Sequence, residues 1–373
     1  MPEEQWEHDT LAALVAGLEA FARDTVASVE RRLAFASSIR KATIEDPRKA
    51  WDEAIASIAN EAECPAYHGL RLTPQLGLLP LGRDPRSGLW EFAHLASGEV
   101  PARDADGKLT LQEATGVVLV LLPGGTFSMG SEPPDSAPPK GPNKDPESRP
   151  SEGPVHQITL APFFMGKYEV TQGQWLRVAG KNPSAYPGGY SIGGKRHTLL
   201  HPVELIGWKD AKTILGRLAL DLPTEAQWEY AARGGTTTVY FTGDSRLSLA
   251  GSVNLADRFS RDNGGPGSWL FEPWLDDGYV VHSPVGAFRP NAFGIHDMIG
   301  NVWEFVEDRY GMYTMPVKPG TGERIVPTET PRVFRGGGFR SNAVHARSSD
   351  RYSLYAPDYR GYDVGVRAAR AVE

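Results

Sequence analysis

The pattern of apolar and polar residues predicts helices at the N-terminus of the chain. Residues 5–62 are rich in Ala, Glu, Arg and Leu, and Leu11, Leu14 and Leu18 recur at the three- and four-residue spacing of an amphipathic helix. We expect two or more helices in an N-terminal region of residues 1–67. A break is predicted near Pro47, because proline cannot continue a helix.

After this region the pattern changes to short apolar pieces separated by turn residues. Residues 68–116 are typical of a small β-rich connector. The apolar run from Val117 to Ser131 predicts a strand that opens a main domain of residues 117–373. Residues 132–154 are dense in Pro, Ser, Gly and charge, so we expect an exposed loop there.

The main domain begins with strands and short capped helices. Thr171 is a good N-cap for a helix that follows two strands. A second helix is expected over residues 209–219, and a third begins at Thr224, where Gln227 completes a capping box. Past Gly235 we expect little helix and many irregular loops.

The C-terminal stretch, residues 332–370, combines a regular frame with freely varied side chains. Three consecutive glycines, Gly336 to Gly338, indicate torsions or close approaches that a side chain would block. Residues 363–367 alternate polar with apolar, as in a strand with one buried face. Guanidinium groups fork onto carboxylates or carbonyls, and we expect three arginines to hold the loop in this way: Arg347, Arg351 and Arg360.

Composition and charge narrow the range of functions that the protein can have. The net charge of −7 argues against general nucleic-acid or anionic-membrane binding, which basic patches drive. No apolar run is long enough to span a bilayer, and the acidic N-terminus is unlike a secretory signal, so we expect a cytoplasmic protein. Cys64 is the only cysteine, which excludes an internal disulfide, a cysteine-rich metal site and a two-thiol redox pair.

Many separate motifs, in order, resemble the formylglycine-generating enzyme or sulfatase-modifying factor family. They are PGGTFSMGS, FFMGKYEVTQGQW, NPSAY, HPVE, LPTEAQWEYAARGG, NAFGIHDMIGNVWEF and RGGGF…GVR, and they cover residues 117–370. The resemblance implies an α+β fold of the C-type-lectin-like, formylglycine-generating enzyme type, with low regular secondary structure. The N-terminal helices and the connector would precede this domain.

The activity of the family does not follow from the resemblance. Its oxidases bind copper through two cysteines, and those positions fall at Ser341 and Ala346 here. A hydroxyl and a methyl group are poor ligands for Cu(I), so we expect no copper and no enzymatic activity. An iron-dependent branch of the family needs H-x-x-x-H-x-E in a helical bundle. His197 and His201 have the first spacing but lie in the lectin-like domain, and we interpret them as structural.

The resemblance also implies structural calcium, which takes oxygen ligands. One set of family positions matches Asp297, Gly300, Val302 and Glu304. The other set matches Asn254, Leu255, Asp277 and Tyr279. The alternative is that these acids stabilise loops by hydrogen bonds alone.

The residues between the frame positions of the C-terminal stretch have a restricted composition. Each of thirteen can be reached from an Asn codon by changing its adenines, and Lys, Glu, Gln, Met and Trp, which cannot, are absent. An ordinary loop would lack all five types about one time in thirty or forty. We call these residues the variable set: Arg340, Ser341, Asn342, Val344, His345, Asp350, Tyr352, Ser353, Leu354, Tyr355, Tyr359, Gly361 and Tyr362.

This pattern resembles the variable proteins of diversity-generating retroelements, in which adenine-specific mutagenesis alters chosen codons on a lectin-like frame. The resemblance implies a non-catalytic, monomeric protein whose variable region, residues 335–367, binds an unknown ligand, expected to be a protein. Tyrosines suit such a surface because they give large amphipathic contacts at small entropic cost. Two alternatives remain: a family oxidase with a different ligand set, and a pseudoenzyme that acts as a protein-interaction module.

Overall fold

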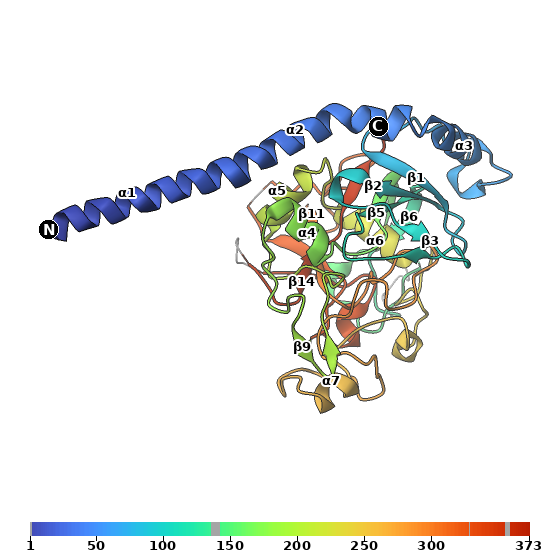
Figure 1. Cartoon of the computed structure of the whole chain (residues 1–373). Coiled ribbons are helices and arrows are strands. Elements are labelled where there is room, and N and C mark those ends of the chain that lie inside the picture. Colours follow the sequence, from blue (N-terminus) through green and yellow to red (C-terminus); the bar gives the residue numbers. More distant parts are fainter. Residues whose placement is uncertain (1, 136–141, 328, 355–358) are drawn as a thin grey trace.

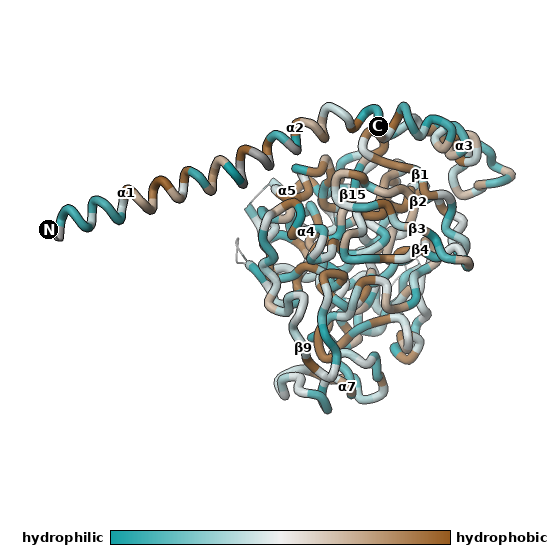
Figure 2. Tube along the Cα trace, in the orientation of Figure 1, coloured by the Kyte–Doolittle hydropathy of each residue, from teal (hydrophilic) through white to brown (hydrophobic). Residues whose placement is uncertain are grey.

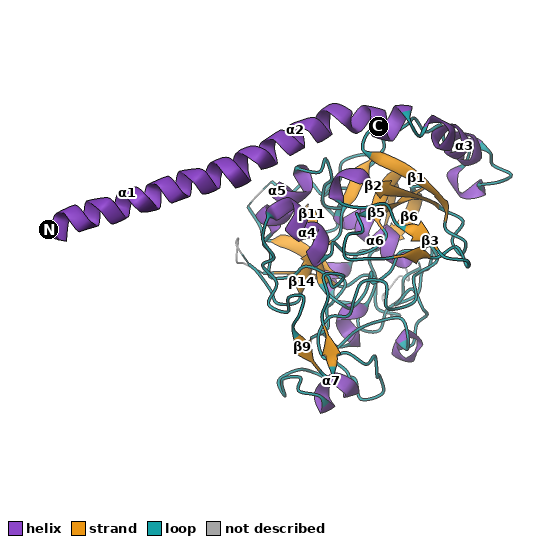
Figure 3. Ribbon diagram, viewed as in Figure 1, coloured by secondary structure: helices purple, strands orange, loops and turns teal. Residues whose placement is uncertain are grey.

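The computed structural model describes residues 2–135, 142–327, 329–354 and 359–373. Loops and turns make up most of the main body, and they surround two small β-sheets (Figure 3). This mixed α+β architecture with sparse regular structure agrees with the fold predicted from the sequence. Within the described residues, no helix combines the length and the apolar character that a bilayer crossing requires.

A long helical rod projects from the body at the N-terminus (Figure 1). It consists of α1 (Pro2–Ala20), a π-helical turn (Phe21–Val26), α2 (Ala27–Arg40) and a second π-helical turn (Lys41–Glu45). Apolar side chains, among them Leu11, Leu14 and Leu18, are exposed along it. Figure 2 shows hydrophobic residues alternating with hydrophilic ones along the rod. The rod ends at Pro47, which confirms the predicted break.

Helix α3 (Arg48–Ala59) joins the rod to the body. The Trp51 ring stacks on Phe92 with centroids 5.5 Å apart, and Trp51 Nε1 donates to the Thr43 carbonyl at 2.7 Å. Ala54 and Ile58 are fully buried on the same face. Burial of one apolar face is what stabilises a short helix, so α3 belongs to the body. The rod contacts the body at its last turn, where Thr43 is buried and its Oγ1 accepts a hydrogen bond from the Gly77 backbone at 3.0 Å.

The larger sheet has five strands in the order β1-β2-β5-β8-β15, all antiparallel. Its strands are β1 (Leu78–Arg83), β2 (Trp90–His94), β5 (Val118–Leu122), β8 (Phe163–Gly166) and β15 (Ala369–Ala371). All five residues of β5 are buried, as expected of a central strand. The boundary that we drew at residue 116 therefore falls between strands of one sheet.

The smaller sheet carries the C-terminal stretch. Its order is β13-β12-β11-β14, and β14 pairs with β11 in parallel. Its strands are β11 (Trp303–Arg309), β12 (Arg332–Arg335), β13 (Arg351–Ser353) and β14 (Val364–Val366). Three two-stranded ribbons complete the β-structure: β3 (Ala102–Arg103) with β4 (Leu109–Thr110), β6 (Gly125–Met129) with β7 (His156–Leu160), and β9 (Ser191–Ile192) with β10 (Lys195–Arg196).

Short capped helices pack on these sheets. They are α4 (Gln172–Ala179), α5 (Trp208–Gly216), α6 (Glu225–Arg233) and α7 (Arg258–Asp262). Thr171 and Thr224 form the predicted caps, with Gln174 and Gln227 as their capping-box partners. Past Gly235, α7 is the one α-helix among the described residues, in agreement with the expectation.

Candidate functional site

The three glycines at the start of the C-terminal stretch are required by their surroundings. Gly336 and Gly337 have φ of 99° and 73°, in the region that favours glycine. A Cβ on Gly336 would lie 2.9 Å from the Met298 carbonyl oxygen, and one on Gly337 would lie 3.0 Å from that of His345. The predicted roles of torsion and close approach are thus confirmed.

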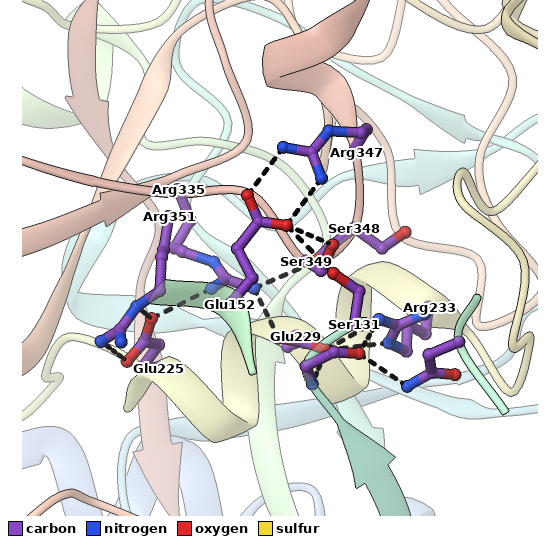
Figure 4. A network of polar contacts seen from close by, with 12 residues as sticks. Ser131, Glu152, Glu225, Glu229, Arg233, Arg335, Arg347, Ser348, Ser349 and Arg351 are labelled. Carbon is purple, nitrogen blue, oxygen red and sulfur yellow. Dashed lines mark hydrogen bonds and ion pairs between the residues drawn. The ribbon is translucent and has the colours of Figure 1, made fainter. Parts of the chain in front are cut away.

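Arg347 is a fully buried cation that ties the C-terminal stretch to a distant segment. Its guanidinium binds both oxygens of Glu152 at 2.6 and 2.7 Å, Asp145 Oδ2 at 2.6 Å and Asp350 Oδ1 at 3.1 Å (Figure 4 shows the pair with Glu152). Burial alone would lower the pKa of Arg347, but these acids raise it above its usual value. Arg347 therefore stays charged in the interior.

Arg351 and Arg335 are also buried cations, and both pair with acids of helix α6. Arg351 forks onto both oxygens of Glu225 at 2.8 Å, and Arg335 binds Glu225 at 3.0 Å and Glu229 at 2.7 Å (Figure 4). Arg360 is half exposed and pairs with Asp210 at 2.8 Å. The sequence prediction that arginines hold the loop is confirmed for all three residues named. We call the buried pairs the arginine network, whose charged members are Asp145, Arg149, Glu152, Glu225, Glu229, Arg233, Arg335, Arg347, Asp350 and Arg351.

The segment expected to be an exposed loop supplies two acids of this network. Glu152 and Asp145 are 0% and 2% exposed, and Asn143 is also buried. The expectation of an exposed loop is therefore wrong for Glu132, Asn143, Asp145 and Glu152. It is confirmed for residues 133–135 and for four prolines of the segment, which are exposed: Pro142, Pro146, Pro150 and Pro154. Polar composition misled us because the acidic side chains are buried as ion pairs, which the interior accepts when every charge has a partner.

A pocket of about 350 Å³ opens where the variable set lies. We call it the C-terminal pocket. It is lined by Ser268, Trp269, Leu270, Trp303, Phe334, Arg340, Ser341, Asn342, His345, Tyr352, Leu354, Tyr359, Asp363 and Val364. Seven of these belong to the variable set. A second hollow of about 350 Å³ shares Phe334, Leu354 and Tyr359 with it, so the two form neighbouring depressions on one face.

The other members of the variable set are divided between surface and interior. Tyr362 is exposed, and Val344 and Ser353 are half-buried. Tyr355 lies outside the described residues. Asp350 is fully buried: Arg149 and Arg347 donate to its Oδ1, and its Oδ2 lies 3.0 Å from His345 Nδ1.

A displayed binding surface requires the variable set to face solvent, and three of its members are instead buried. Asp350 belongs to the arginine network, and its replacement would leave Arg347 with less negative charge. A Cβ on buried Gly361 would lie 2.7 Å from Val364 Cγ2, so that position does not accept a side chain without movement. Ser341 is 8% exposed, although it reaches the pocket wall. Sequence composition does not distinguish a packed loop position from an open one.

Of the two positions that carry copper-binding cysteines in the family's oxidases, Ser341 lines the pocket and Ala346 lies in the interior. Ser341 Oγ accepts a hydrogen bond from the Gly338 backbone at 3.1 Å. Ala346 is fully buried and offers a methyl group. Trp303, 6% exposed, also lines the C-terminal pocket, and its ring contacts Phe334, His345 and Tyr352. Neither position supplies a thiolate.

Trp269 and Leu270 also line the pocket, and sequence reasoning did not select them. They lie in the irregular segment before β11, and Leu270 is 72% exposed. Trp269 packs on Phe339 with ring centroids 5.7 Å apart. The available signal was a Trp-Leu pair inside a stretch rich in Gly and Pro, where exposed apolar residues need an explanation.

The first predicted calcium set fits a metal ion poorly. Arg367 donates hydrogen bonds to both oxygens of Glu304, and its Nη2 lies 2.6 Å from Glu304 Oε1. Trp228 Nε1 donates to Glu304 Oε2 at 2.8 Å. Arg367 also donates to the carbonyl of Asp297 at 3.2 Å, and Asp297 Oδ2 accepts from the Gly286 backbone. The guanidinium thus supplies the positive charge that we expected from calcium near Asp297, Gly300, Val302 and Glu304.

The second predicted set fits calcium better. Asn254 Oδ1 is buried and has no hydrogen-bond partner among the described residues. Burial and the nearby Asp257 raise the pKa of Asp277 to about 8, and this carboxyl accepts hydrogen bonds only from the backbone of Leu255 and Tyr279. An unpaired amide oxygen and a partly buried carboxyl that has no ion pair among the described residues are donors of the kind that calcium takes.

Comparison with known proteins agrees with this geometry. Residues 107–372 match the sulfatase-modifying factor enzyme 1-like domain. The formylglycine-generating enzyme of Thermomonospora curvata is 30% identical over 305 residues, which cover 67% of this chain and 92% of the relative. Among solved structures, PvdO from Pseudomonas aeruginosa superposes with a TM-score of 0.53 at 28% identity, covering 74% of this chain and 98% of PvdO.

A further solved structure shares the fold at lower identity. Treponema denticola variable protein 1 superposes with a TM-score of 0.52 at 20% identity, covering 69% of this chain and 96% of that protein. At this identity the likeness shows the fold alone. Taken with the matched domain, which spans more than half of the chain, these results identify the protein as a member of the sulfatase-modifying factor enzyme 1-like family.

Proposed function

We propose that this protein is a non-catalytic, ligand-binding member of its family, and that the C-terminal pocket holds a segment of a protein ligand. The observation that carries the proposal is the absence of thiols at the two positions that bind copper in the family's oxidases. The two positions that would supply thiolates are Ser341, whose hydroxyl is already hydrogen-bonded, and buried Ala346. Soft Cu(I) selects thiolate ligands, so the oxidase chemistry of the family has no anchor here.

The lining of the C-terminal pocket suits a peptide or protein surface. Trp269, Tyr352 and Tyr359 present rings that can pack against apolar side chains, and tyrosine hydroxyls can also form hydrogen bonds. Arg340 is partly exposed at the rim and lies 3.6 Å from Asp363. A volume of about 350 Å³ is near the lower end for small-molecule sites and accepts one or two anchoring side chains of a larger ligand.

The finer proposal is that a retroelement diversifies the variable set. It is supported by the residue types at those positions and by the seven members that share one pocket wall. Sequencing the DNA around the gene tests it. A reverse transcriptase gene with a template repeat that differs from the variable region at adenines is expected, and the absence of both ends this part of the proposal. Binding through the pocket does not depend on it.

The alternative is an oxidase of the formylglycine-generating type, which the 30% identity to the enzyme of Thermomonospora curvata favours. The two functions differ in copper chemistry. We expect the wild-type protein to bind no Cu(I) tightly and to consume no oxygen with a cysteine-containing sulfatase peptide. Copper-dependent oxygen consumption by the wild type would overturn the binding proposal.

A double variant sharpens this test. Ser341→Cys with Ala346→Cys restores thiols at both family positions and is expected to gain Cu(I) binding. Ser341→Cys alone is the matched control, because one thiolate gives a much weaker site. A double variant that binds no more copper than the single variant would show that this part of the protein differs from a copper site in more than its two side chains.

We also propose that calcium braces the loops behind the pocket through the second predicted set. Asn254 and Asp277 would supply side-chain oxygens, and Leu255 and Tyr279 would supply carbonyl oxygens. The support is the unpartnered Asn254 Oδ1 together with the partly buried carboxyl of Asp277, whose pKa is raised. The role would be structural, because these residues do not line the pocket.

A further inference from the structure

Three histidines meet inside the main domain. His197 and His201 come from the segment after β10, and His282 comes from a loop 81 residues beyond His201. Their ligand-forming nitrogens all lie within 4.8 Å of one another. His197 and His201 are each 3% exposed and His282 is 0% exposed, so all three rings lie in the interior.

His282 has no polar partner for either ring nitrogen among the described residues. The nearest charged group is Glu204, whose Oε1 lies 3.8 Å from His282 Nε2 and whose Oε2 is also buried and unpartnered. Leaving a buried polar group unpaired costs about 1–3 kcal/mol. Three unpartnered atoms in one small volume therefore require an explanation that the protein atoms do not provide.

The other two rings are oriented as metal-binding imidazoles usually are. His197 Nδ1 lies 3.2 Å from the Tyr186 carbonyl oxygen, and His201 Nδ1 lies 3.1 Å from that of Thr198. The Thr198 backbone N–H also contacts His201 Nδ1 at 3.1 Å, so the tautomer of His201 decides which of its nitrogens carries the proton. In the tautomer whose Nδ1 donates to the carbonyl, Nε2 keeps a free lone pair for a metal. Glu204 is held in place from behind, since its Oε1 accepts from the Tyr186 backbone at 2.9 Å.

We propose that His197, His201, His282 and Glu204 bind a divalent transition-metal ion, with zinc as the expected metal. Three imidazoles and one carboxylate form a four-ligand set that zinc accepts in tetrahedral geometry. Tetrahedral zinc holds its ligand atoms ~3.3 Å apart, so small rotations of the side chains would bring them onto one ion. This site differs from the calcium sets, which consist of oxygen ligands at other residues.

The ion would be structural, because all four ligands are buried and no position is left open to solvent. It would join the segment around His197 to the loop of His282. Phe339 packs edge-on against His282 and Tyr186, with centroids 5.8 and 5.7 Å apart. Phe339 directly precedes Arg340, so the metal would brace the start of the C-terminal pocket wall from behind.

The pattern of buried neutral histidines supports this assignment. All three rings are at most 3% exposed, and a neutral imidazole offers one lone pair to a metal. From the sequence we interpreted His197 and His201 as structural. The third histidine and the unpartnered carboxylate change that interpretation, and neither follows from the spacing of the first two.

Metal content after refolding tests the site. The full chain is unfolded in guanidinium with chelator, refolded with or without zinc chloride, passed through gel filtration and analysed for zinc. Wild-type protein is expected to retain one zinc ion per chain. His282→Asn is expected to retain at least tenfold less, and Glu204→Gln to bind zinc at least tenfold more weakly.

The matched control is His94→Asn, which removes another buried histidine, one whose Nε2 contacts the Leu218 carbonyl away from this cluster. It is expected to retain zinc as the wild type does. Cobalt gives a second readout that needs no destabilised variant, because tetrahedral Co(II) absorbs strongly in the visible. Wild-type protein that refolds without retaining zinc and shows no such cobalt band would overturn the proposal, as would equal zinc retention by His282→Asn.

Discussion

Arg347 and Tyr352 are five residues apart in the chain but occupy opposite environments. Arg347 is fully buried among three carboxylates, whereas Tyr352 is 38% exposed and lines the C-terminal pocket. The backbone between them follows the same loop. The position of each side chain relative to the arginine network therefore decides whether it holds the loop or faces a ligand.

The difference between these regions shows how an irregular loop can be both rigid and varied. Few of its backbone groups belong to regular ladders, so side-chain ion pairs replace them as the source of fixed shape. A buried ion pair stabilises little compared with an apolar pair, but breaking one partner is costly. Removing a charged side chain from the arginine network is therefore costly in stability. The pocket side chains, in contrast, make contacts that other residues could replace.

The largest effect is expected when one network cation is removed. Arg347→Met leaves Glu152, Asp145 and Asp350 buried without their shared partner, which costs about 3–5 kcal/mol of the free energy of unfolding. Urea unfolding measures this loss. Arg340→Met is the matched control on the pocket rim and is expected to change stability by less than about 0.5 kcal/mol. Equal losses in the two variants would remove the distinction between the regions.

The second effect concerns the charge state of an acid behind the network. Burial and the nearby Glu225 raise the pKa of Asp308 from 3.8 to about 7. Between these two pKa values the folded protein keeps a proton that the unfolded chain has released. The contribution of Asp308 to the free energy of unfolding is therefore fully present below about pH 4 and is lost as the pH rises towards 7. A shift of about three units corresponds to at most ~4 kcal/mol.

Asp308→Asn is expected to flatten the stability profile between about pH 4 and 7, as measured by urea unfolding at each pH. Both oxygens of Asp308 accept backbone hydrogen bonds, from Glu225 and Arg324 at 2.7 Å. Glu329→Gln, which changes an exposed carboxylate, is the control. A profile that keeps its full slope in Asp308→Asn would assign the pH dependence to other groups.

A smaller effect is expected from calcium. With free calcium at one hundred times its dissociation constant, a folded-state site adds about 2.7 kcal/mol, which a thermal melt with and without chelator detects. Asn254→Ala is expected to abolish the response. Asp297→Asn should leave it intact, because Arg367 already occupies both oxygens of Glu304 in the first set. Loss of the response in Asp297→Asn alone would reverse our assignment of the two sets.

The smallest effect is expected on the pocket side. Arg340→Ser, Val344→Ser and Tyr362→Ser together should lower the free energy of unfolding by less than about 1 kcal/mol, because none of these side chains is buried. Circular dichroism with urea unfolding measures the change. A loss as large as that of Arg347→Met would show that these residues hold the fold, and would contradict the binding surface.

Local features of the fold could be predicted because their causes lie within a few residues. The caps at Thr171 and Thr224 need a partner three positions away, and the break at Pro47 follows from its own ring. The glycines of the C-terminal stretch were recognisable for the same reason. Family resemblance added the fold class, which no local pattern contains.

The candidate site was predicted only in part, because its members come from distant segments. The acids that neutralise Arg347 lie about 200 residues earlier in the chain, inside a segment whose composition is typical of an exposed loop. Trp269 reaches the pocket, and His282 reaches His197, through contacts of the same long-range kind. Asp350 and Gly361 share the composition of the variable set but are packed inside.

The sequence by itself determined the family, the capped helices, the glycine turns and the absence of the two thiols, since each depends on residue identity or on short spacings. Tertiary structure alone decided which polar residues are buried in pairs, which line the pocket and which histidines meet. The physical reason is that the free energy of a charge or an imidazole depends on the groups within a few ångströms of it, and in an irregular fold those groups come from anywhere in the chain.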